Sequence, residues 1–383
     1  MLLRNVSMIG DSGVNDILLK GGYIADIGPA GQPESASQDE VRLDNAIAFP
    51  GLINSHDHLD FDLFPQIGNH LYPNYREWGN DIHANNKEQI QAVLRVPQAT
   101  RTRWGMYRNL LNGFTTVVNH GDQLAVKDDP VTVWQSPISI HSVGFDKRWR
   151  WKLNKPAFQK IYNIHVGEGT DAIASSEIDS LIRWNFLKRK IIAVHGVAMS
   201  EKQAASFLAM VWCPVSNDFL LRQTARVDLL KQHTHILFGS DSTLTAGWDI
   251  WEQLRFARQT RMLTDLELYE AITTKPAEVW KMPGSGRLEP GYSSDIVVAR
   301  KKKEDSLGSF FEITPADILM VIKKGVIQLF DDSLQEQLKM IDRHDFVKLT
   351  MGESVKHVRG NIDTTIKEIK EHIPGNELPV KLL

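Results

Sequence analysis

Cysteine is almost absent from this chain of 383 residues, since only Cys213 is present. A single thiol excludes an intramolecular disulfide and any cluster of thiolate metal ligands. It also excludes the zinc-deaminase motif in which cysteines bind the metal. A metal ion in this protein would therefore have to be bound by imidazole and carboxylate groups.

Long apolar runs and a large excess of one charge are also missing. No run approaches the roughly 20 apolar residues that a membrane span requires, and residues 1–5 (MLLRN) lack the apolar segment of a secretory signal. The formal net charge of −3 gives no field that would attract nucleic acid or an anionic membrane. We expect a cytoplasmic protein whose partner is a small molecule, and we leave homo-oligomerisation open.

What the chain does contain is a regular alternation of apolar strands and helical segments. Helical patterns occupy residues 98–111, 175–188, 201–207 and 266–273. The strand candidates are residues 52–58, 115–119, 138–143, 161–166, 191–195, 209–213 and 235–239. This alternation predicts an α/β fold whose parallel strands close into a (β/α)8 TIM-type barrel. Residues 145–160 are basic, rich in Trp and short for a β/α unit, so we expect distortion around strand 4.

Strand patterns return at both ends of the chain and predict a second, smaller domain. We assign residues 1–48 to the N-terminal part of a β-sandwich domain and residues 49–282 to the barrel. Residues 283–332 would form the C-terminal part of the β-sandwich domain, and residues 333–383 a C-terminal extension. Turns such as Lys20-Gly21-Gly22 and Lys323-Lys324-Gly325 separate the expected strands of this domain.

His56 and His58 form the first candidate metal site. Side chains two residues apart on a strand point to the same face, and in a parallel barrel the carboxyl end of each strand opens into the active-site mouth. Two imidazoles at that end could chelate one cation. The alternative is a pair of histidines packed at a strand end, but two buried imidazoles without a shared partner would be costly.

Three further strand candidates end in groups that can bind a metal or transfer a proton. His165 ends one strand and is followed by Glu168, His195 ends the next, and Asp241 follows the last. Each of these alone has an ordinary structural explanation, because Asp and Glu are common helix caps and a lone histidine is usually part of the core. Their occurrence at the ends of separate strands is harder to explain by capping, so the set predicts a metal-dependent hydrolase.

The ordered motifs resemble those of the amidohydrolase superfamily, over about residues 10–330. The nearest branch is that of the cytosine, guanine and adenosine-type deaminases and the triazine chlorohydrolases. The motifs that support this are FPGLINSHDH (49–58), GFTTVV (113–118), HVGE (165–168), HG (195–196), CPVSN (213–217), GSDS (239–242), GRLEPGY (286–292) and SDIVV (294–298).

This resemblance implies one divalent ion, Zn or Fe, together with a role for each motif residue. The ion would be bound by His56, His58, His165 and Asp241. Asp241 would also take a proton from a water molecule, His195 would orient that water or polarise the substrate, and Glu168 would pass a proton to a ring nitrogen. A dinuclear site, with His165 and His195 on the second ion, remains an alternative. The absence of a lysine in a convincing fourth strand disfavours a bridging carbamylated lysine.

The expected reaction is hydrolysis of a carbon–nitrogen bond other than a peptide bond, with ammonia leaving a cyclic amidine or heterocycle. Hydrolysis of a cyclic amide and release of another group such as halide are alternatives within the enzymes. A catalytically silent scaffold protein is the alternative outside them.

Candidate substrate-binding residues follow from their positions along the chain. Trp78 belongs to an aromatic-rich segment after His58, and such loops shape the substrate site of barrels. His120 follows the second strand and Asn217 follows the seventh. Structural packing is the alternative for all three.

Overall fold

Eight parallel strands form the part of the molecule that contains the histidine motifs. The computed structural model describes residues 1–31, 39–126, 130–157, 160–339 and 341–383. One sheet has the order β13-β12-β11-β10-β9 and a second the order β6-β7-β8, and all their pairings are parallel. The strands are β6 (Leu52–Asp57), β7 (Phe114–Asn119), β8 (Thr132–Trp134), β9 (Ile138–Ser142), β10 (Ile161–Val166), β11 (Lys190–His195), β12 (Ala209–Trp212) and β13 (His235–Phe238).

The two parallel sheets approach each other where β13 runs beside β6. The backbone N–H of Asp241 donates to the carbonyl of His56 at 3.1 Å, and that of Ser240 donates to Asn54 Oδ1 at 3.0 Å. A Cβ atom on Gly239 would lie 2.7 Å from the Cβ of His56. The close approach therefore requires glycine at this position and brings the ends of the first and last parallel strands together.

Helices connect most of these strands, as the sequence predicts. They are α3 (Gln98–Leu111), α4 (Trp149–Asn154), α5 (Ala172–Trp184), α6 (Glu201–Ala204), α7 (Pro214–Leu221), α8 (Val227–Leu230), α9 (Ile250–Gln259), α10 (Asp265–Glu270) and α11 (Thr274–Val279). Only residues 135–137 separate β8 from β9, too few for a helical crossover. The sequence analysis expected the distortion in residues 145–160, but there the described residues contain the short helix α4. The irregularity lies instead between β8 and β9, which follow each other without a helix.

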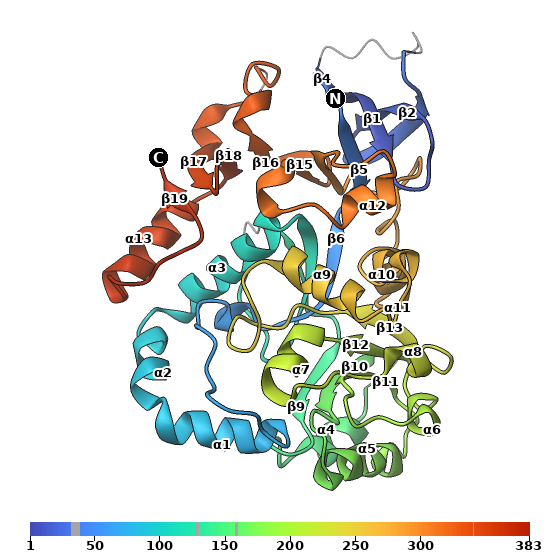
Figure 1. Ribbon diagram of the computed structural model, residues 1–383, viewed down its shortest axis with the longest axis vertical. Helices are drawn as coiled ribbons and strands as arrows, with labels where there is room; N and C mark the ends of the chain where they lie inside the picture. The colour runs from blue at the N-terminus through green and yellow to red at the C-terminus, as the bar shows by residue number, and fades with distance from the viewer. Residues whose placement is uncertain (32–38, 127–129, 158–159, 340) are drawn as a thin grey trace.

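Two more helices, α1 (Tyr75–Asn85) and α2 (Lys87–Leu94), lie in the long connection between β6 and α3. They follow a short 3-10 helix, η1 (Leu59–Phe61). The Asn74 side chain caps α1 by accepting hydrogen bonds from the N–H groups of Arg76 and Glu77, which satisfies donors that the first helical turn leaves unpaired. Figure 1 shows α1 and α2 to one side of the parallel strands.

A third sheet combines both ends of the chain. Its strand order is β19-β17-β18-β16-β15-β14-β5-β1-β2-β3, and β4 pairs with β1. The N-terminal strands are β1 (Leu2–Met8), β2 (Val14–Lys20), β3 (Tyr23–Pro29), β4 (Glu40–Arg42) and β5 (Ala46–Pro50). The C-terminal strands are β14 (Ile296–Arg300), β15 (Ile318–Lys323), β16 (Val326–Asp331), β17 (Phe346–Met351), β18 (Ser354–Arg359) and β19 (Lys381–Leu382). Antiparallel pairing of β5 with β14 joins the two chain ends.

The elements after Leu334 extend this sheet and also pack against the helix α3. β17, β18 and β19 add to the edge formed by β16. Between them, α13 (Ile362–His372) lies against α3, where Thr100 donates a hydrogen bond to Glu368 at 2.6 Å. A short helix, α12 (Ser306–Phe310), precedes β15, and the 3-10 turns η2 (Pro315–Asp317), η3 (Asp332–Leu334) and η4 (Arg343–Asp345) complete this half.

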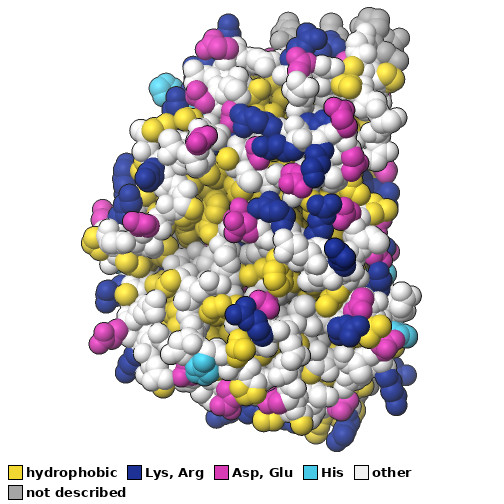
Figure 2. All heavy atoms as spheres, in the orientation of Figure 1, with side chains coloured by type: hydrophobic (Ala, Val, Ile, Leu, Met, Phe, Trp, Pro, Cys, Tyr) yellow, Lys and Arg dark blue, Asp and Glu magenta, His cyan; other side chains and the backbone are white. Residues whose placement is uncertain are grey.

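The surface agrees with the balanced composition. Figure 2 shows Lys, Arg, Asp and Glu side chains interspersed on the face displayed. Within the described part of the chain, no helix has both the length and the apolar character needed to cross a membrane.

Gly105 gives a test of how tightly α3 packs on η1. A Cβ atom there would lie 2.3 Å from the carbonyl oxygen of Leu59. Replacing glycine by alanine inside a helix usually stabilises a protein by roughly 0.5–1 kcal/mol. We expect Gly105→Ala instead to lower the free energy of unfolding by about 1–3 kcal/mol, the usual cost of overpacking.

Urea denaturation would measure this change, with Gly247→Ala as the control because no atom lies within 4 Å of a Cβ placed there. Equal effects of the two substitutions would contradict the inferred contact.

Candidate metal centre and active site

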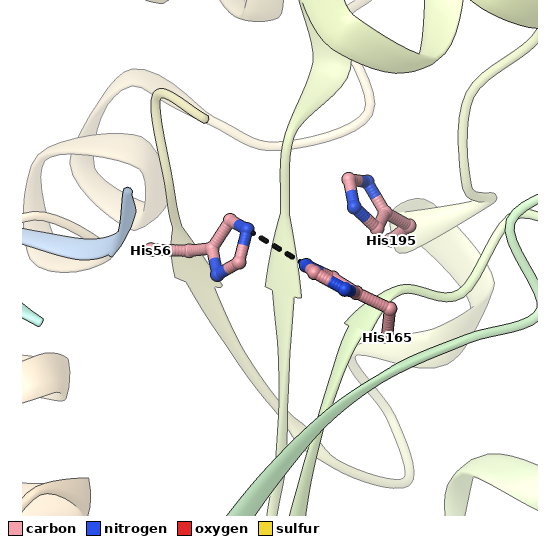
Figure 3. Close-up of side chains that lie close together, drawn as sticks. All are labelled: His56, His165 and His195. Atoms are coloured by element: carbon pink, nitrogen blue, oxygen red, sulfur yellow. Dashed lines mark hydrogen bonds between the residues drawn. The ribbon is translucent and has the colours of Figure 1, made fainter. Parts of the chain in front are cut away.

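Three histidines from two strands bring their Nε2 atoms together at the carboxyl ends of the parallel strands. His56 is near the end of β6, His58 follows that strand, and His165 lies on β10. His165 Nε2 is 3.2 Å from His56 Nε2 and 3.3 Å from His58 Nε2. Figure 3 shows His56 and His165 pointing toward each other, with His195 beside them.

This arrangement fits a divalent metal ion better than it fits a hydrogen-bonded histidine cluster. Zn–N distances of about 2.0–2.1 Å place two tetrahedral nitrogen ligands about 3.3 Å apart. Burial and the neighbouring histidines hold the pKa values of His56 and His165 well below the usual range. Both rings are therefore neutral, as ligands must be. Ligand atoms of His56, His58 and Asp241 all lie within 4.8 Å of one another, and so do those of His56, His165 and His195.

Asp241 supplies the carboxylate of this group. It follows β13 in a left-handed conformation (φ 55°). Its Oδ2 accepts a hydrogen bond from Ser216 Oγ at 2.7 Å, and its Oδ1 accepts one from the N–H of Ser242 at 2.8 Å. Burial acts to raise the pKa of Asp241, but His195, His58 and these hydrogen bonds outweigh it and lower the pKa. The carboxylate is therefore ionised, with Oδ1 3.8 Å from His56 Nε2.

His195 lies between two acidic side chains. The Asn217 amide lies 3.0 Å from His195 Nδ1, and donation from that amide places the ring proton on Nε2. His195 Nε2 is 3.5 Å from Glu168 Oε2 and 3.9 Å from Asp241 Oδ2. Burial lowers the pKa of His195 to about 4. His195 also has a positive φ of 73°, and such backbone strain in a non-glycine residue is typical of functional sites.

Glu168 differs from Asp241 in its protonation state. Burial, with the charges of Asp241 and Glu177, raises the pKa of Glu168 well above its usual value. A neutral carboxylic acid and an ionised carboxylate therefore flank the same imidazole. Carboxyl groups whose surroundings move their pKa values apart are typical of acid–base catalysis.

Arg108 connects the metal-binding residues to the body of the protein, although nothing in the sequence pattern distinguishes it. It lies on α3 with its side chain fully buried. Its Nη1 donates to Asp62 Oδ1 at 2.5 Å and to the carbonyl oxygen of Asp241 at 2.9 Å. Its Nη2 donates to the carbonyl oxygen of Gly247, also at 2.9 Å. Arg108 therefore fixes the backbone on which the Asp241 carboxylate depends.

Asp57, between the two motif histidines, belongs to the same buried hydrogen-bond network as Arg108. Its Oδ2 accepts hydrogen bonds from Asn109 Nδ2 at 2.8 Å and Asn54 Nδ2 at 3.1 Å, and it lies 3.5 Å from Arg108 Nη1. Asp57 is absent from the lining of the cavity described next, in keeping with the alternation of side chains along β6. Its role is to position the strand.

A cavity of about 550 Å³ opens onto the metal-binding group, a size typical of small-molecule sites. His58, His165, Glu168, His195 and Asp241 line its floor. Side chains of α1 and α2 and of the loops after β6, β9 and β13 line its walls. All the predicted catalytic residues therefore meet one cavity. Of the four predicted metal ligands, only His56 is missing from the lining, because its side chain is fully buried beneath them.

The three predicted substrate-binding residues lie in different places. Trp78, on α1, lines the cavity. Asn217 is fully buried and holds His195. His120 is buried with its ring stacked on His165, the centroids 4.1 Å apart, and within the described part of the chain neither of its ring nitrogens has a hydrogen-bond partner. Neither His120 nor Asn217 belongs to the cavity lining.

Arg108 gives a test of this buried network. We expect Arg108→Met to lower the free energy of unfolding by about 3–5 kcal/mol, because it leaves the Asp62 carboxylate buried without its partner. Urea denaturation would measure the loss. Arg103→Met on the same helix is the control. The Arg103 side chain is 28% exposed and pairs with Glu368, with Nη2 and Oε2 3.6 Å apart. Exposed ion pairs of this kind contribute about 0–1 kcal/mol. A comparable loss in both variants would show that Arg108 has no special role.

Comparison with known proteins agrees with this geometry. The model of the Amidohydrolase family matches residues 159–327. The chain is 24% identical over 305 residues to a 5'-deoxyadenosine deaminase from Methanothrix thermoacetophila, covering 67% of this chain and 73% of the relative. It is 21% identical over 405 residues to a 5-methylthioadenosine/S-adenosylhomocysteine deaminase from Caldicellulosiruptor saccharolyticus, covering 87% of this chain and 94% of the relative.

Solved structures show the same fold at low sequence identity. A zinc-bound adenosine deaminase from Xanthomonas campestris superposes with a TM-score of 0.72 at 15% identity, covering 97% of each chain. The zinc complex of atrazine chlorohydrolase TrzN from Arthrobacter aurescens TC1 gives a TM-score of 0.68 at 16% identity, covering 97% of this chain and all of the other. The family model and the sequence relatives confirm the resemblance that the motifs show to the amidohydrolase superfamily.

Proposed function

We propose that this protein is a metal-dependent hydrolase that removes ammonia from a heterocyclic amine. The observation that supports this most directly is the pair of carboxyl groups beside His195. Glu168 is a neutral acid and Asp241 an ionised base, and both line the cavity next to the histidine cluster. Hydrolytic deamination needs both, one group to take a proton from water and one to give a proton to the substrate.

His56, His58, His165 and Asp241 would hold one Zn or Fe ion. A divalent cation bound there would lower the pKa of a water molecule toward about 7 and so supply a nucleophile at neutral pH. Ser216 and Ser242 keep Asp241 oriented through the two hydrogen bonds described above. The zinc bound in two of the structural neighbours supports this choice of metal.

The chain's own residues then account for the proton transfers. Asp241 takes the proton of the attacking water, while the Nε2–H of His195 orients the oxygen. Glu168 gives its proton to a ring nitrogen beside the carbon that is attacked. A C–O bond forms, the C–N bond to the exocyclic amine breaks, and the amine leaves as ammonia with the proton first taken by Asp241. The second proton of the attacking water returns to Glu168 as the carbonyl product forms.

The named relatives support ammonia as the leaving group, because each curated relative that we describe is a deaminase. The structural neighbour that is a chlorohydrolase keeps halide release as the second candidate reaction, with cyclic amide hydrolysis beside it. A silent scaffold would not need the opposed protonation states of Glu168 and Asp241. We further propose that β6–β13 close into one barrel spanning residues 49–282, with residues 1–48 and 283–332 forming the β-domain.

Metal content tests the centre itself. We expect about one zinc or iron ion per chain by elemental analysis, and a large loss of bound metal in His58→Ala because three ligands would remain. His141→Ala is the matched control, since His141 lines the same cavity but belongs to neither group of ligand atoms. A content near two ions would instead indicate a dinuclear site with His195 as a ligand, and negligible binding after reconstitution would favour the scaffold.

Glu168→Gln separates proton transfer from metal binding. We expect this variant to retain its metal and to release ammonia about 10²–10⁴-fold more slowly, the usual contribution of a general acid. Metal analysis and an ammonia assay over a panel of amino-heterocycles would measure the two properties. Asp295→Asn serves as the control, because Asp295 is also a buried acid but does not line the cavity. Loss of metal from Glu168→Gln would show that Glu168 has a different role.

A further inference from the structure

Many of the side chains that line the cavity away from the metal-binding group are apolar. Phe61 and Phe64 follow β6, Leu244 follows β13, and Ile82, Ile90 and Leu94 come from α1 and α2. The rings of Phe61 and Phe64 make an edge contact with centroids 5.6 Å apart. A ligand that reaches the floor must therefore place the rest of its surface against hydrocarbon.

The charges that line the cavity offer no partner to an anionic group. Among the described residues, the lining contains no lysine or arginine. Its two carboxyl groups, Glu168 and Asp241, both lie beside His195 on the floor. A carboxylate on the ligand would lose its hydration without gaining a counter-ion, which is strongly unfavourable.

Two polar side chains of α1 that line the cavity are engaged within the protein. Trp78 Nε1 donates to the carbonyl of Ile67 at 2.7 Å. The hydroxyl of Tyr75 donates to Glu177 at 3.2 Å and accepts from the N–H of Gly144 at 2.8 Å. Neither side chain can bind the hydroxyl groups of a sugar without breaking these bonds. The free polar groups of α1, Asn80 and His83, are exposed.

The apolar surface continues outward. Leu94 is 41% exposed and Phe145 is 43% exposed, and both line the cavity. Phe145 packs on α1, where a Cβ atom on Gly79 would lie 2.9 Å from its Cζ atom, and its ring makes an edge contact with Tyr75 at 5.3 Å. Half-exposed apolar side chains that continue a cavity wall are typical of a site for an apolar ligand.

We propose that the site selects an uncharged, flat amino-heterocycle that bears an apolar alkyl or aryl substituent. The amine-bearing carbon lies over the floor, and the substituent lies along the wall formed by α1, α2, Phe61 and Leu244. A ribose or an amino-acid group in the same place would meet hydrocarbon instead of hydrogen-bond partners. This inference rests on the proposed function and names the substrate class within it.

Binding to the metal-loaded Glu168→Gln variant tests this selectivity without turnover. Titration calorimetry would compare 9-benzyladenine with adenosine and with 9-(2-carboxyethyl)adenine. A second series would compare 2-amino-4-butylamino-1,3,5-triazine with the analogue that bears a terminal carboxylate. We expect the apolar member to bind at least tenfold more tightly than the polar members in a series that binds. Tighter binding of a polar member, or no binding of either apolar member, would overturn the proposal.

A charge introduced at the wall gives the complementary test. Leu94→Arg, made in the Glu168→Gln background, should improve binding of the carboxylate-bearing ligand relative to the apolar one by at least tenfold. The control is Leu229→Arg on α8, where the leucine is similarly exposed at 39% but does not line the cavity. An unchanged ratio in Leu94→Arg would contradict the assignment of this wall to the substituent.

Turnover in the parent protein distinguishes the proposed deamination reaction from the proposed preference for an apolar substituent. Selective binding of apolar heterocycles without release of ammonia would mean that the proposed reaction is wrong and the binding class is right. Release of ammonia with a preference for sugar-bearing or charged substrates would mean that the proposed reaction is right and the proposed binding class is wrong.

Discussion

Three imidazoles impose the central constraint on this molecule, because His165 Nε2 lies 3.2 Å from His56 Nε2 and 3.3 Å from His58 Nε2. Without a shared cation, their lone pairs would be buried against one another, which is unfavourable. His56 and His58 come from one strand, and His165 comes from a strand more than 100 residues later. The parallel sheets must therefore bring these strand ends together, and buried groups around them hold the imidazoles in place.

Support for this centre comes from buried groups that never reach the cavity. Arg108 holds the Asp241 backbone, and Asn217 sets the orientation of His195. Asp57 links β6 to α3 through Asn109. These contacts keep the reactive groups in place without contributing chemistry, as outer residues around metal sites commonly do. Precision at the floor thus depends on the parallel strands and on α3 together.

The cavity combines two different environments. Its floor is polar and separates the protonation states of Glu168 and Asp241, whereas its wall is hydrocarbon contributed by α1, α2 and loops. The floor is formed by residues of the sequence motifs, namely His58, His165, Glu168, His195 and Asp241. The wall comes from the connection after β6 and is the part that proteins with this fold are free to vary. The proposed reaction and the proposed selectivity therefore rest on separate elements.

The sequence by itself indicated the resemblance to the amidohydrolase superfamily and seven of the eight parallel strands that the structure describes. It also gave the candidate site residues His56, His58, His165, Glu168, His195 and Asp241, because strand periodicity and short motifs are local properties. It did not reveal Arg108, which looks like any other arginine of a helix, nor the continuity of β8 with β9. It also did not separate Trp78, which lines the cavity, from residues packed behind it. Only the tertiary structure decided these points, because each depends on contacts between segments far apart in the chain.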